Sequence, residues 1–551
     1  MLPFKQILFP IFAQTVTMKK ILLTVIIFLL GKNLIQAQTS PFEIFLEPMN
    51  ISGLGGLQAF AFGQYDGKWL IVGGRLDGLH RRQPFASFDV AGNNNQLLVI
   101  DPTTQQFWTA TIGALSVDLQ EQLSSTNMQF HQEGNYLYVL GGYGYHTATA
   151  SRKTFEFLTA IDVPSTINAI VNSGNISPYF RQISDTTFGV TGGQLRMINN
   201  TYYLIGGNRF DGNYNPMGNP TYTQVYTNAI RKFNIIDNGT SISITHLPSH
   251  YDAANLRRRD YNAIAQILPN GAEGITAFSG VFQPNVDLPF LNSVTIDSTN
   301  YTVNNLFQQH YNHYHCANLP LYGATNQQMH NVFFGGIAQF YDSAGVMVQD
   351  NNVPFVKTIA RVTRDAAGVL SEHKMGVEMP AYLGAGSEFI PLLNNPHFNN
   401  EVFKLDDFVN DTTHVGYIYG GINSSEANIF FTNSGTQSSA SSTIFKVYVI
   451  KNNAVQIGEI EDHKSQGLQP VIYPNPGHGD FNLQFFLEKA TDVTFRVQSL
   501  NGTILVEKTI EQMSPGQHVI KSLFQQSLKE SVYLMTIKTN QEEITRKIIV
   551  E

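Results

Sequence analysis

A repeated strand pattern that ends in a pair of glycines constrains the fold of this 551-residue chain more than any other feature. Six copies occur, and their final glycines are Gly74, Gly142, Gly207, Gly280, Gly336 and Gly421, so the unit recurs every 56 to 85 residues. Each copy has a short apolar strand before it and a further strand pattern after it, as in LQAFAF, KWLIVGG and NQLLVID of the first unit. A repeat of this kind predicts a series of similar small sheets instead of one large core.

The repeated unit resembles the kelch repeat, in which each unit builds one four-stranded blade of a β-propeller. The glycine pairs have a mechanical reason in such a fold, because a side chain there would collide with the adjacent strand or blade. Six units predict an all-β, six-bladed kelch-like propeller. The fourth unit departs from the pattern with Ser279-Gly280. The spacings exceed the roughly 50 residues usual for kelch repeats, which predicts long connecting loops.

The way in which the ring closes is open from the sequence. The segment FEIFLEP, Phe42 to Pro48, is a strand pattern outside the six units, and it is a candidate to close the ring beside the last blade. A seventh, degenerate blade is the alternative to this closure. A large array of β-sandwiches is the alternative to a propeller, because short strand patterns do not by themselves determine the architecture.

The C-terminal region is a second set of alternating strands. In FNLQF, VTFRVQSL, TILVEKTI, YLMTIKT and TRKIIV, apolar residues alternate with polar ones, and Asn501-Gly502 is a dipeptide that tight hairpin turns prefer. The pattern predicts a small antiparallel β-sandwich. An adhesive β-domain of immunoglobulin type is the alternative.

This region resembles the C-terminal sorting domain of proteins exported by the bacterial type IX secretion system, the Por secretion type. The motifs that carry the resemblance are Tyr473-Pro474-Asn475-Pro476, Leu500-Asn501-Gly502, Val532-Tyr533-Leu534 and Lys547-Ile548-Ile549-Val550. The residues expected to serve sorting are Pro474, Asn475, Pro476, Gly502, Tyr533 and Lys547. The resemblance implies that the secretion machinery is a partner of the chain. It also implies that the protein passes through the periplasm and is secreted or attached to the outer surface of the outer membrane.

The N-terminal region has the organisation of a secretory signal. Met18-Lys19-Lys20 precedes an apolar run from Ile21 to Leu30 and a polar stretch that ends near Ala37. Residues 1–37 are therefore predicted to be a signal peptide with its true start at Met18. Ten apolar residues are too few for the roughly 20 that span a bilayer, so no transmembrane segment is predicted. The remaining domains are predicted as a propeller over residues 38–460, a linker over 461–470 and the sorting domain over 471–551.

Composition agrees with a folded exterior protein. Aromatic residues make up 12% of the chain and charged residues only 14%, which is typical of a β-rich protein and not of a disordered one. The formal net charge of -8 argues against a nucleic-acid partner, since phosphate binding needs clustered Lys and Arg. The single cysteine, Cys316, excludes an internal disulfide. We expect a monomer.

Candidate site residues follow from the propeller geometry, because the inner strand of each blade lines the axis. The residues expected to bind a ligand near the axis or at its rim are Asn127, Gln129, Arg258, Arg259, Tyr261, Arg75, Tyr143 and Arg209. The cluster Arg257-Arg258-Arg259-Asp260-Tyr261 is the strongest positive one, and an arginine fork beside an aromatic ring suits a carboxylate or an acidic sugar. The alternative is that one arginine pairs with Asp260 or an adjacent blade and the others are solvated.

The segment HYNHYHC, His310 to Cys316, is the densest set of potential metal ligands. On a strand, His313 and His315 would project to the same face and could reach one ion. Kelch propellers include copper radical oxidases that use His, Tyr and Cys, but the remaining ligands of those enzymes are not recognisable in this sequence. We therefore expect no cofactor, and keep His313, His315 and Cys316 as the candidates should a metal ion bind.

Two classes of function are compatible with these residues, since a propeller is a scaffold that does not determine activity. The preferred interpretation is a secreted or surface-attached propeller that binds a glycan or a protein without chemistry. The alternative is a carbohydrate-active enzyme. It would be either an acidic-sugar mutarotase or epimerase, for which a sialic acid mutarotase on a kelch propeller is the precedent and Glu388 the candidate general base, or a metal-dependent sugar oxidase.

Overall fold

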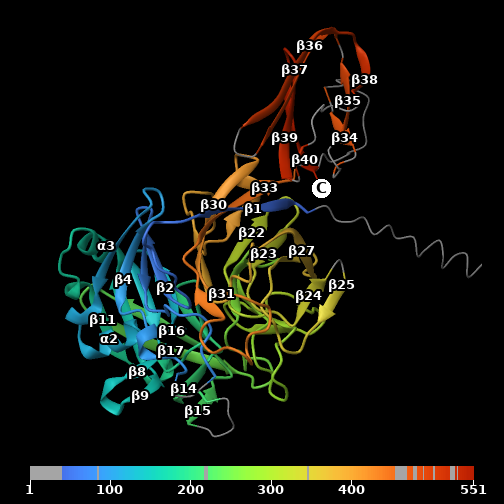
Figure 1. Ribbon diagram of the computed structural model, residues 1–551. Helices are drawn as coiled ribbons and strands as arrows, with labels where there is room; N and C mark the ends of the chain where they lie inside the picture. The colour runs from blue at the N-terminus through green and yellow to red at the C-terminus, as the bar shows by residue number, and fades with distance from the viewer. Residues whose placement is uncertain are drawn as a thin grey trace, which may run out of the picture. The chain divides into compact units, whose positions relative to one another are not determined.

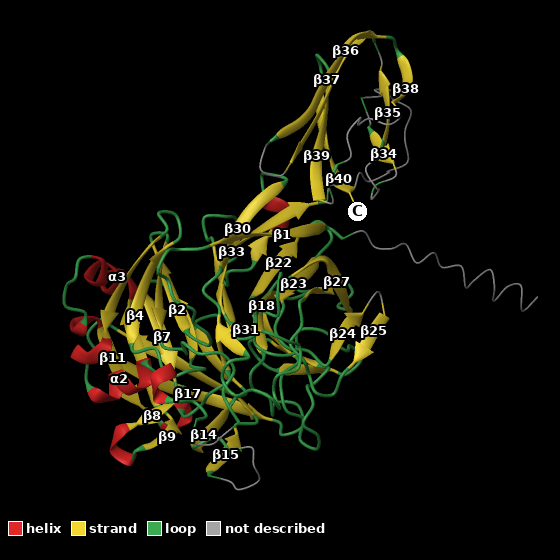
Figure 2. Cartoon of the chain, in the orientation of Figure 1, coloured by secondary structure: helices red, strands yellow, loops and turns green. Residues whose placement is uncertain are grey.

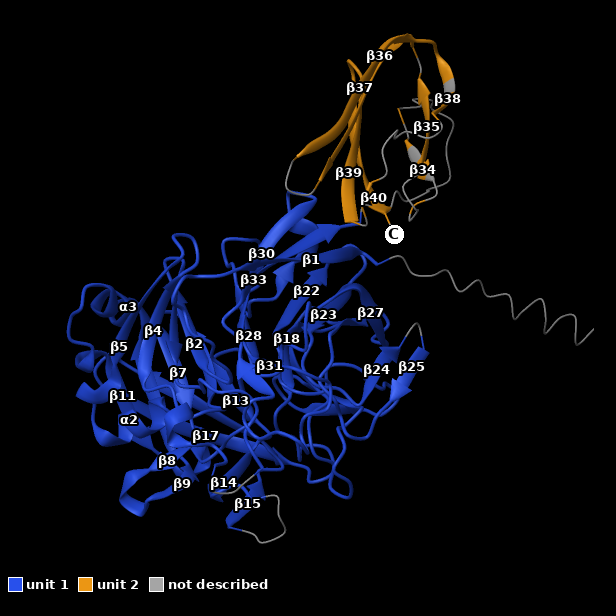
Figure 3. Cartoon of the chain, in the orientation of Figure 1, with its two compact units in different colours: residues 1–454 blue, residues 455–551 orange. Residues whose placement is uncertain are grey.

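The structure is a computed structural model that describes residues 40–82, 86–215, 221–343, 346–452, 468, 470–473, 475, 481–487, 489–499, 503–520, 528–529 and 531–550. The chain divides into two compact units, residues 1–454 and residues 455–551 (Figure 3). Strands dominate both units (Figure 2). The predicted signal peptide, most of the predicted linker, and Pro474, Pro476 and Gly502 lie outside the described residues. No helix in the described ranges is both long enough and apolar enough to cross a membrane.

Six sheets with a four-stranded antiparallel core form the first unit in the described residues (Figure 1). Blade one is β2 (Ala61–Tyr65), β3 (Lys68–Val72), β4 (Gln96–Asp101) and β5 (Gln106–Thr111), and blade two is β6 (Gln129–Glu133), β7 (Tyr136–Leu140), β10 (Phe157–Asp162) and β11 (Phe180–Ser184). Blade three is β12 (Gln194–Ile198), β13 (Thr201–Ile205), β16 (Ala229–Asp237) and β17 (Ile242–Tyr251), and blade four is β18 (Asn262–Ile267), β19 (Glu273–Phe278), β20 (Ser293–Ile296) and β21 (Tyr301–Asn304).

The fifth and sixth sheets differ from this plan at their edges. Blade five is β22 (Asn318–Gly323), β23 (Gln328–Phe334), β26 (Thr358–Arg364) and β27 (Leu370–Glu378), with β29 (Phe403–Lys404) added in parallel beside β22. Blade six is β28 (Ser387–Pro391), β30 (Thr412–Gly420), β33 (Ile444–Lys451) and β1 (Phe42–Met49). The chain is therefore an all-β, six-bladed kelch-like propeller followed by a second β-unit, as the repeats predict.

The N-terminal strand closes the ring. β1 pairs with β33 in antiparallel register, from Phe42 opposite Lys451 to Met49 opposite Ile444. The outermost strand of blade six thus comes from the start of the described chain, and the other three come from its last repeat. This confirms the predicted role of Phe42 to Pro48, and the described residues contain no seventh blade.

The glycine pairs join each blade to the next one. The N–H of the second glycine donates to a backbone carbonyl oxygen of the following blade in all six units, at 2.6 to 3.2 Å: Gly74 to Ser125, Gly142 to Val190, Gly207 to Arg258, Gly280 to His313, Gly336 to Leu383 and Gly421 to Leu57. A Cβ atom at Gly141, which has a φ of 61°, would lie 2.0 Å from the Val190 carbonyl oxygen. The predicted reason for these glycines, close approach of the adjacent blade, is confirmed.

Long connections follow the glycine pairs, as the repeat spacing predicts. Four of them form two-stranded hairpins: β8 (Tyr143–His146) with β9 (Ser151–Thr154), β14 (Asn208–Gly212) with β15 (Tyr222–Tyr226), β24 (Phe340–Ser343) with β25 (Val346–Gln349), and β31 (Ile422–Ser424) with β32 (Ser438–Ala440). Short 3-10 helices lie at Val90–Gly92, Ile112–Ala114, Thr147–Thr149, Ser177–Tyr179, Thr186–Phe188 and Leu405–Asp407. Three of these hairpins, β8–β9, β14–β15 and β31–β32, supply side chains for the site described below.

Two α-helices lie beside blades one and two. They are α2 (Val117–Leu123) and α3 (Val163–Val171). The carboxylate of Asp162 caps α3 by accepting from the Ser165 N–H, and Pro164 in the first turn needs no hydrogen bond. The apolar face of α3, which includes Ile167 and Ile170, packs into the core shared by these two blades. The helices therefore fill the space between neighbouring sheets.

The second unit contains two antiparallel sheets. One is β34 (Val471–Tyr473), β35 (Asn482–Leu487) and β38 (Gly516–Ile520), and the other is β37 (Ile504–Met513), β36 (Thr491–Ser499), β39 (Ser531–Lys538) and β40 (Glu543–Val550). Alternate residues such as Phe485, Phe495 and Ile537 form its core. Asn475 ties the opening motif to the last strand, because its amide donates to the Lys547 carbonyl oxygen and its oxygen accepts from the Ile549 N–H. Tyr533 donates its hydroxyl to the Lys529 carbonyl oxygen.

Candidate binding site at the propeller axis

A closed ring of six backbone hydrogen bonds surrounds the axis of the propeller. Each blade contributes a residue one to three positions before its inner strand: Ala59, Asn127, Gly192, Asp260, His315 and Gly386. The N–H of each residue donates to the carbonyl oxygen of the preceding one, and Ala59 donates to Gly386, at distances of 2.8 to 3.2 Å. Five of these residues, all except His315, have a positive φ of 49° to 70°. Glycine, asparagine and aspartate tolerate this conformation best, which fits four of the five.

A pocket of about 670 Å³ opens on one side of this ring, and all six blades contribute to its wall. The lining includes Arg75 and Arg82 from blade one, Tyr143 from blade two, Tyr222 and Tyr226 from blade three, Arg257, Arg259 and Phe282 from blade four, Tyr314 and His315 from blade five, and Ile422 and Phe430 from blade six. A second cavity, of about 30 Å³, is lined by inner-strand residues such as Gln129, Gln194 and Glu388. Both spaces share Ala59, Asn127, Asp260 and His315 of the ring, so the ring separates them.

Aromatic rings form a large part of the pocket wall. The rings at the pocket are Phe88, Tyr143, Phe210, Tyr214, Tyr222, Tyr226, Phe282, Tyr314, Phe430 and Phe431. They hold one another in place: Phe210 stacks on Tyr222 with centroids 4.5 Å apart, and His80 stacks on Phe88 at 4.8 Å. Burial lowers the pKa of His80 to about 4, so its imidazole is neutral at physiological pH.

Two of the four arginines at the pocket are engaged by carboxylates. Arg75 is only 2% exposed, and its guanidinium donates to both Asp77 oxygens and to Asn93. Arg259 donates to Asp260 at 3.0 Å and to the Tyr226 hydroxyl at 3.1 Å. Burial alone would lower the pKa of Arg259, but Asp260 together with Tyr226 and Tyr314 outweighs burial and raises it. Both guanidinium groups are therefore held in position by these hydrogen bonds.

The other two arginines lie on aromatic faces. The Arg257 guanidinium carbon is 3.8 Å from the centroid of the Tyr226 ring, and one of its nitrogens donates to the Phe282 carbonyl oxygen. Arg82 lies over Phe431 at 4.9 Å. Neither forms an ion pair with a carboxylate in the described parts of the chain. With Asp77, Asp260 and Asp287 as the nearby carboxylates, the pocket carries a small excess of positive charge.

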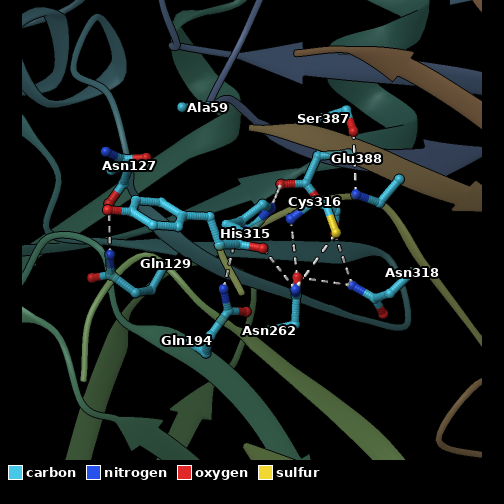
Figure 4. A network of polar contacts seen from close by, with 12 residues as sticks. Ala59, Asn127, Gln129, Gln194, Asn262, His315, Cys316, Asn318, Ser387 and Glu388 are labelled. Carbon is cyan, nitrogen blue, oxygen red and sulfur yellow. Dashed lines mark hydrogen bonds and ion pairs between the residues drawn. The ribbon is translucent and has the colours of Figure 1, made fainter. Parts of the chain in front are cut away.

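His315 lies on the floor of the pocket between two polar partners (Figure 4). Its Nε2 is 2.8 Å from the Glu388 carboxylate, and its Nδ1 is 3.0 Å from the Gln194 amide nitrogen. The same amide donates to the Tyr261 carbonyl oxygen, so in this arrangement Nδ1 accepts and Nε2 carries the hydrogen beside the Glu388 carboxylate. Burial lowers the pKa of His315, but Glu388 outweighs burial and raises it overall. Both ring nitrogens are thus engaged.

The residues predicted from the sequence fall into three groups. Arg75, Asn127, Tyr143, Arg259 and His315 line the pocket, whereas Gln129 and Glu388 line the smaller cavity beyond the ring. Arg209 lies outside both linings, where it pairs with Glu156 and Asp211.

The remaining predicted residues lie inside the blades. Arg258 is 1% exposed and donates to the carbonyl oxygens of Asn255, Ser279 and Asn292. The Tyr261 hydroxyl donates to the Ile205 carbonyl oxygen. Arg258 therefore holds blade four together, Tyr261 links blade four to blade three, and neither side chain lines the pocket.

The expectation that His313 and His315 share one face of a strand is wrong, because β22 begins only at Asn318 and Asn312 has a φ of 52°. The His313 imidazole contacts the Gln309 carbonyl oxygen and the Gln339 N–H. Burial raises the pKa of the Cys316 thiol to about 12. Among the residues that the structure describes, no three His, Cys, Asp or Glu side chains are grouped so that they could hold a metal ion.

Sequence reasoning missed part of the pocket. Arg82, Tyr222, Tyr226, Phe282 and Phe431 lie on the connections after the glycine pairs. Arg257 belongs to the arginine cluster, but the sequence pattern does not place it among the residues expected to bind a ligand. The available signal was the length and aromatic content of these connections, which contribute most of the wall.

Comparisons with known proteins identify the second unit. Residues 471–551 match the family described as the secretion system C-terminal sorting domain. No curated protein matches the chain.

Two solved structures match the chain at low similarity. The structure of YjhT has 11% sequence identity and a TM-score of 0.40, over 72% of this chain and 99% of that chain. A novel fungal alcohol oxidase of the AA5 family, in complex with copper, has 10% identity and a TM-score of 0.37, over 93% of this chain and all of that chain. Such scores bear on neither the ligand nor the chemistry of the pocket. The protein is thus a kelch-like six-bladed propeller with a type IX secretion sorting domain, which directs it through the secretion machinery to the cell exterior.

Proposed function

We propose that the propeller binds a sugar residue of an extracellular glycan in its axial pocket, without altering it chemically. The observation that carries this proposal is the pocket of about 670 Å³ with aromatic walls and arginine side chains. Small-ligand sites have volumes of about 300 to 1,000 Å³ and combine apolar walls with a few polar groups. A folded protein partner would instead need a contact of about 800 Å² on each side, so the enclosed shape favours a glycan.

The charges of the pocket indicate which glycans suit it. Four arginines near three carboxylates disfavour a cationic ligand and favour a neutral or an acidic sugar. Arg257 and Arg82 carry their charge on aromatic faces and are the groups best placed to meet a ligand carboxylate, because the charges of Arg75 and Arg259 are already paired.

The acid and base groups near the floor favour binding over catalysis. Glu388, the candidate general base, lines the small cavity and not the pocket, and its carboxylate faces His315. His315 itself has both nitrogens engaged, and Asp260 pairs with Arg259. A general base needs a lone pair within reach of the substrate proton, and these groups direct theirs at neighbouring protein side chains.

Replacing Arg257 with alanine is expected to weaken binding of an acidic glycan about tenfold, because a charge-assisted hydrogen bond contributes about 1.5 kcal/mol or more. The matched control is Arg209→Ala, which removes the same group from an ion pair outside the pocket and should leave the affinity unchanged. The measurement is a panel of acidic and neutral glycans, followed by calorimetric titration of the tightest member. Equal affinities for the wild type and Arg257→Ala, or the absence of any binding, would contradict the proposal.

A further inference from the structure

We infer that the axial pocket binds the end of a glycan chain and excludes internal segments of it. This inference rests on the proposed function and adds which part of the polymer is recognised. It follows from the enclosure of the pocket on its sides and at its floor. A groove lets a polymer enter at one side and leave at the other, whereas a pocket with a single opening admits only a terminus.

The sides of the pocket are closed by the whole ring of blades. Arg75, Tyr143, Tyr226, Phe282, Tyr314 and Phe430 come from blades one to six in that order. A chain that crossed the pocket would have to pass between two of these blades near the axis. Next to the axial ring the glycine pairs prevent this, since each pair bonds its blade to the next through the backbone.

The floor is formed by a ring of bonded backbone, with the His315 side chain held at it by Glu388 and Gln194. The six hydrogen bonds of the axial ring use one N–H and one carbonyl oxygen of every member, from Ala59 to Gly386. A side chain can rotate away from a tunnel, but this ring opens only if several bonded blades separate. Beyond it lies a cavity of about 30 Å³, about the space of one water molecule. Glu388 and Gln194 border that cavity, and both hold His315.

The size of the pocket limits how much of the chain end enters. A volume of about 670 Å³ is that of a site for a single small ligand, so roughly one or two sugar rings are enclosed. Sugar units further from the terminus then lie outside and add little to the affinity. The affinity is therefore expected to level off at short chain lengths.

The dependence of affinity on oligosaccharide length is measured with the purified full-length protein and two series of one to six units. The oligogalacturonates are acidic, and the malto-oligosaccharides are neutral. We expect the affinity of the series that binds to stop rising after about two or three units. For neutral chains, α-cyclodextrin has the six glucose units of maltohexaose without an end, and we expect it to bind at least tenfold more weakly. For acidic chains, partial cleavage of polygalacturonate should increase the number of bound protein molecules per mass in proportion to the number of ends.

The possible outcomes separate this inference from the proposed function. An affinity that continues to rise from three to six units, or an endless ring that binds as tightly as the linear chain, overturns chain-end recognition and leaves glycan binding in place. If neither series nor any glycan of the panel binds, the proposed function fails and chain-end recognition fails with it. Arg257→Ala should weaken the two-unit and six-unit oligogalacturonates by the same factor, with Arg209→Ala as the control. A loss confined to the longer oligomer would also overturn the inference.

Discussion

Replacing Arg258 with alanine is expected to lower the free energy of unfolding of the propeller by about 3 to 5 kcal/mol. The buried guanidinium donates to the carbonyl oxygens of Asn255, Ser279 and Asn292, and it also lies over the Phe290 ring at 4.3 Å. Each buried acceptor that loses its donor costs about 1 to 3 kcal/mol, and the vacated volume adds a cavity cost. Burial also lowers the pKa of Arg258 to about 9, as expected for a desolvated cation.

Denaturant unfolding followed by tryptophan fluorescence measures this change, since both tryptophans, Trp69 and Trp108, lie in blade one. Arg209→Ala is again the control, because its ion pairs are partly exposed and contribute about 1 kcal/mol or less. A loss of less than about 1 kcal/mol for Arg258→Ala would show that the side chain is not a structural link of blade four.

Replacing Phe42 with alanine is expected to destabilise the propeller by about 3 to 5 kcal/mol, because this residue anchors the strand that closes the ring. Phe42 is fully buried and packs edge-on against His330 at 5.4 Å, with the Arg361 guanidinium 5.5 Å from its ring. Loss of this ring creates a cavity between blades five and six.

The same strand provides a matched control for this substitution. Phe45 is 42% exposed, so Phe45→Ala should cost about 1 kcal/mol or less. Unfolding in urea or guanidinium gives the free energy of unfolding of each variant. The difference between the two values separates the contribution of ring closure from the general effect of removing a phenylalanine side chain. Equal losses would contradict the assignment of β1 to blade six.

The architecture could be predicted because it depends on backbone contacts that leave a pattern in the sequence. A glycine pair is required wherever one blade approaches the next, so each interface is marked, and the hairpin-rich connections account for the extra spacing between units. The fourth repeat is an exception to this rule. Ser279 replaces the first glycine of the fourth pair, adopts a φ of 51° and donates its hydroxyl to the Phe290 carbonyl oxygen. The backbone conformation at this position favours glycine, but a serine is accommodated because its side chain is small and has a hydrogen-bond acceptor nearby.

The site could be predicted only in part, because neighbouring residues point in opposite directions. Arg257 and Arg259 reach the pocket, whereas Arg258 between them lies inside the blade. A cluster of three arginines shows that positive charge lies near the axis. Which of these side chains points into the pocket depends on the residue at which the inner strand begins. Arg209 shows the same effect, since both of its neighbours, Asn208 and Phe210, line the pocket.

The aromatic wall could not be predicted because it comes from connections without a repeat. Tyr222 and Tyr226 lie on β15, far in sequence from Phe282 and Phe431, and only the folded ring brings them to one opening. No periodicity relates these residues, so their positions depend on tertiary contacts. The axial ring is the opposite case, since its members occupy equivalent places before each inner strand, and the recurrence of Gly, Asn and Asp there was an available signal.

The location of a bound oligosaccharide in a crystal structure of the protein tests the axial pocket most directly, with the tightest-binding glycan of the panel as the ligand. We expect one terminal sugar within the ring of aromatic side chains, near Tyr226 and Arg257, with the rest of the chain leading out through the mouth of the pocket. A glycan bound on the outer strands of the blades or along the sorting domain, with the axial pocket empty, would contradict this account.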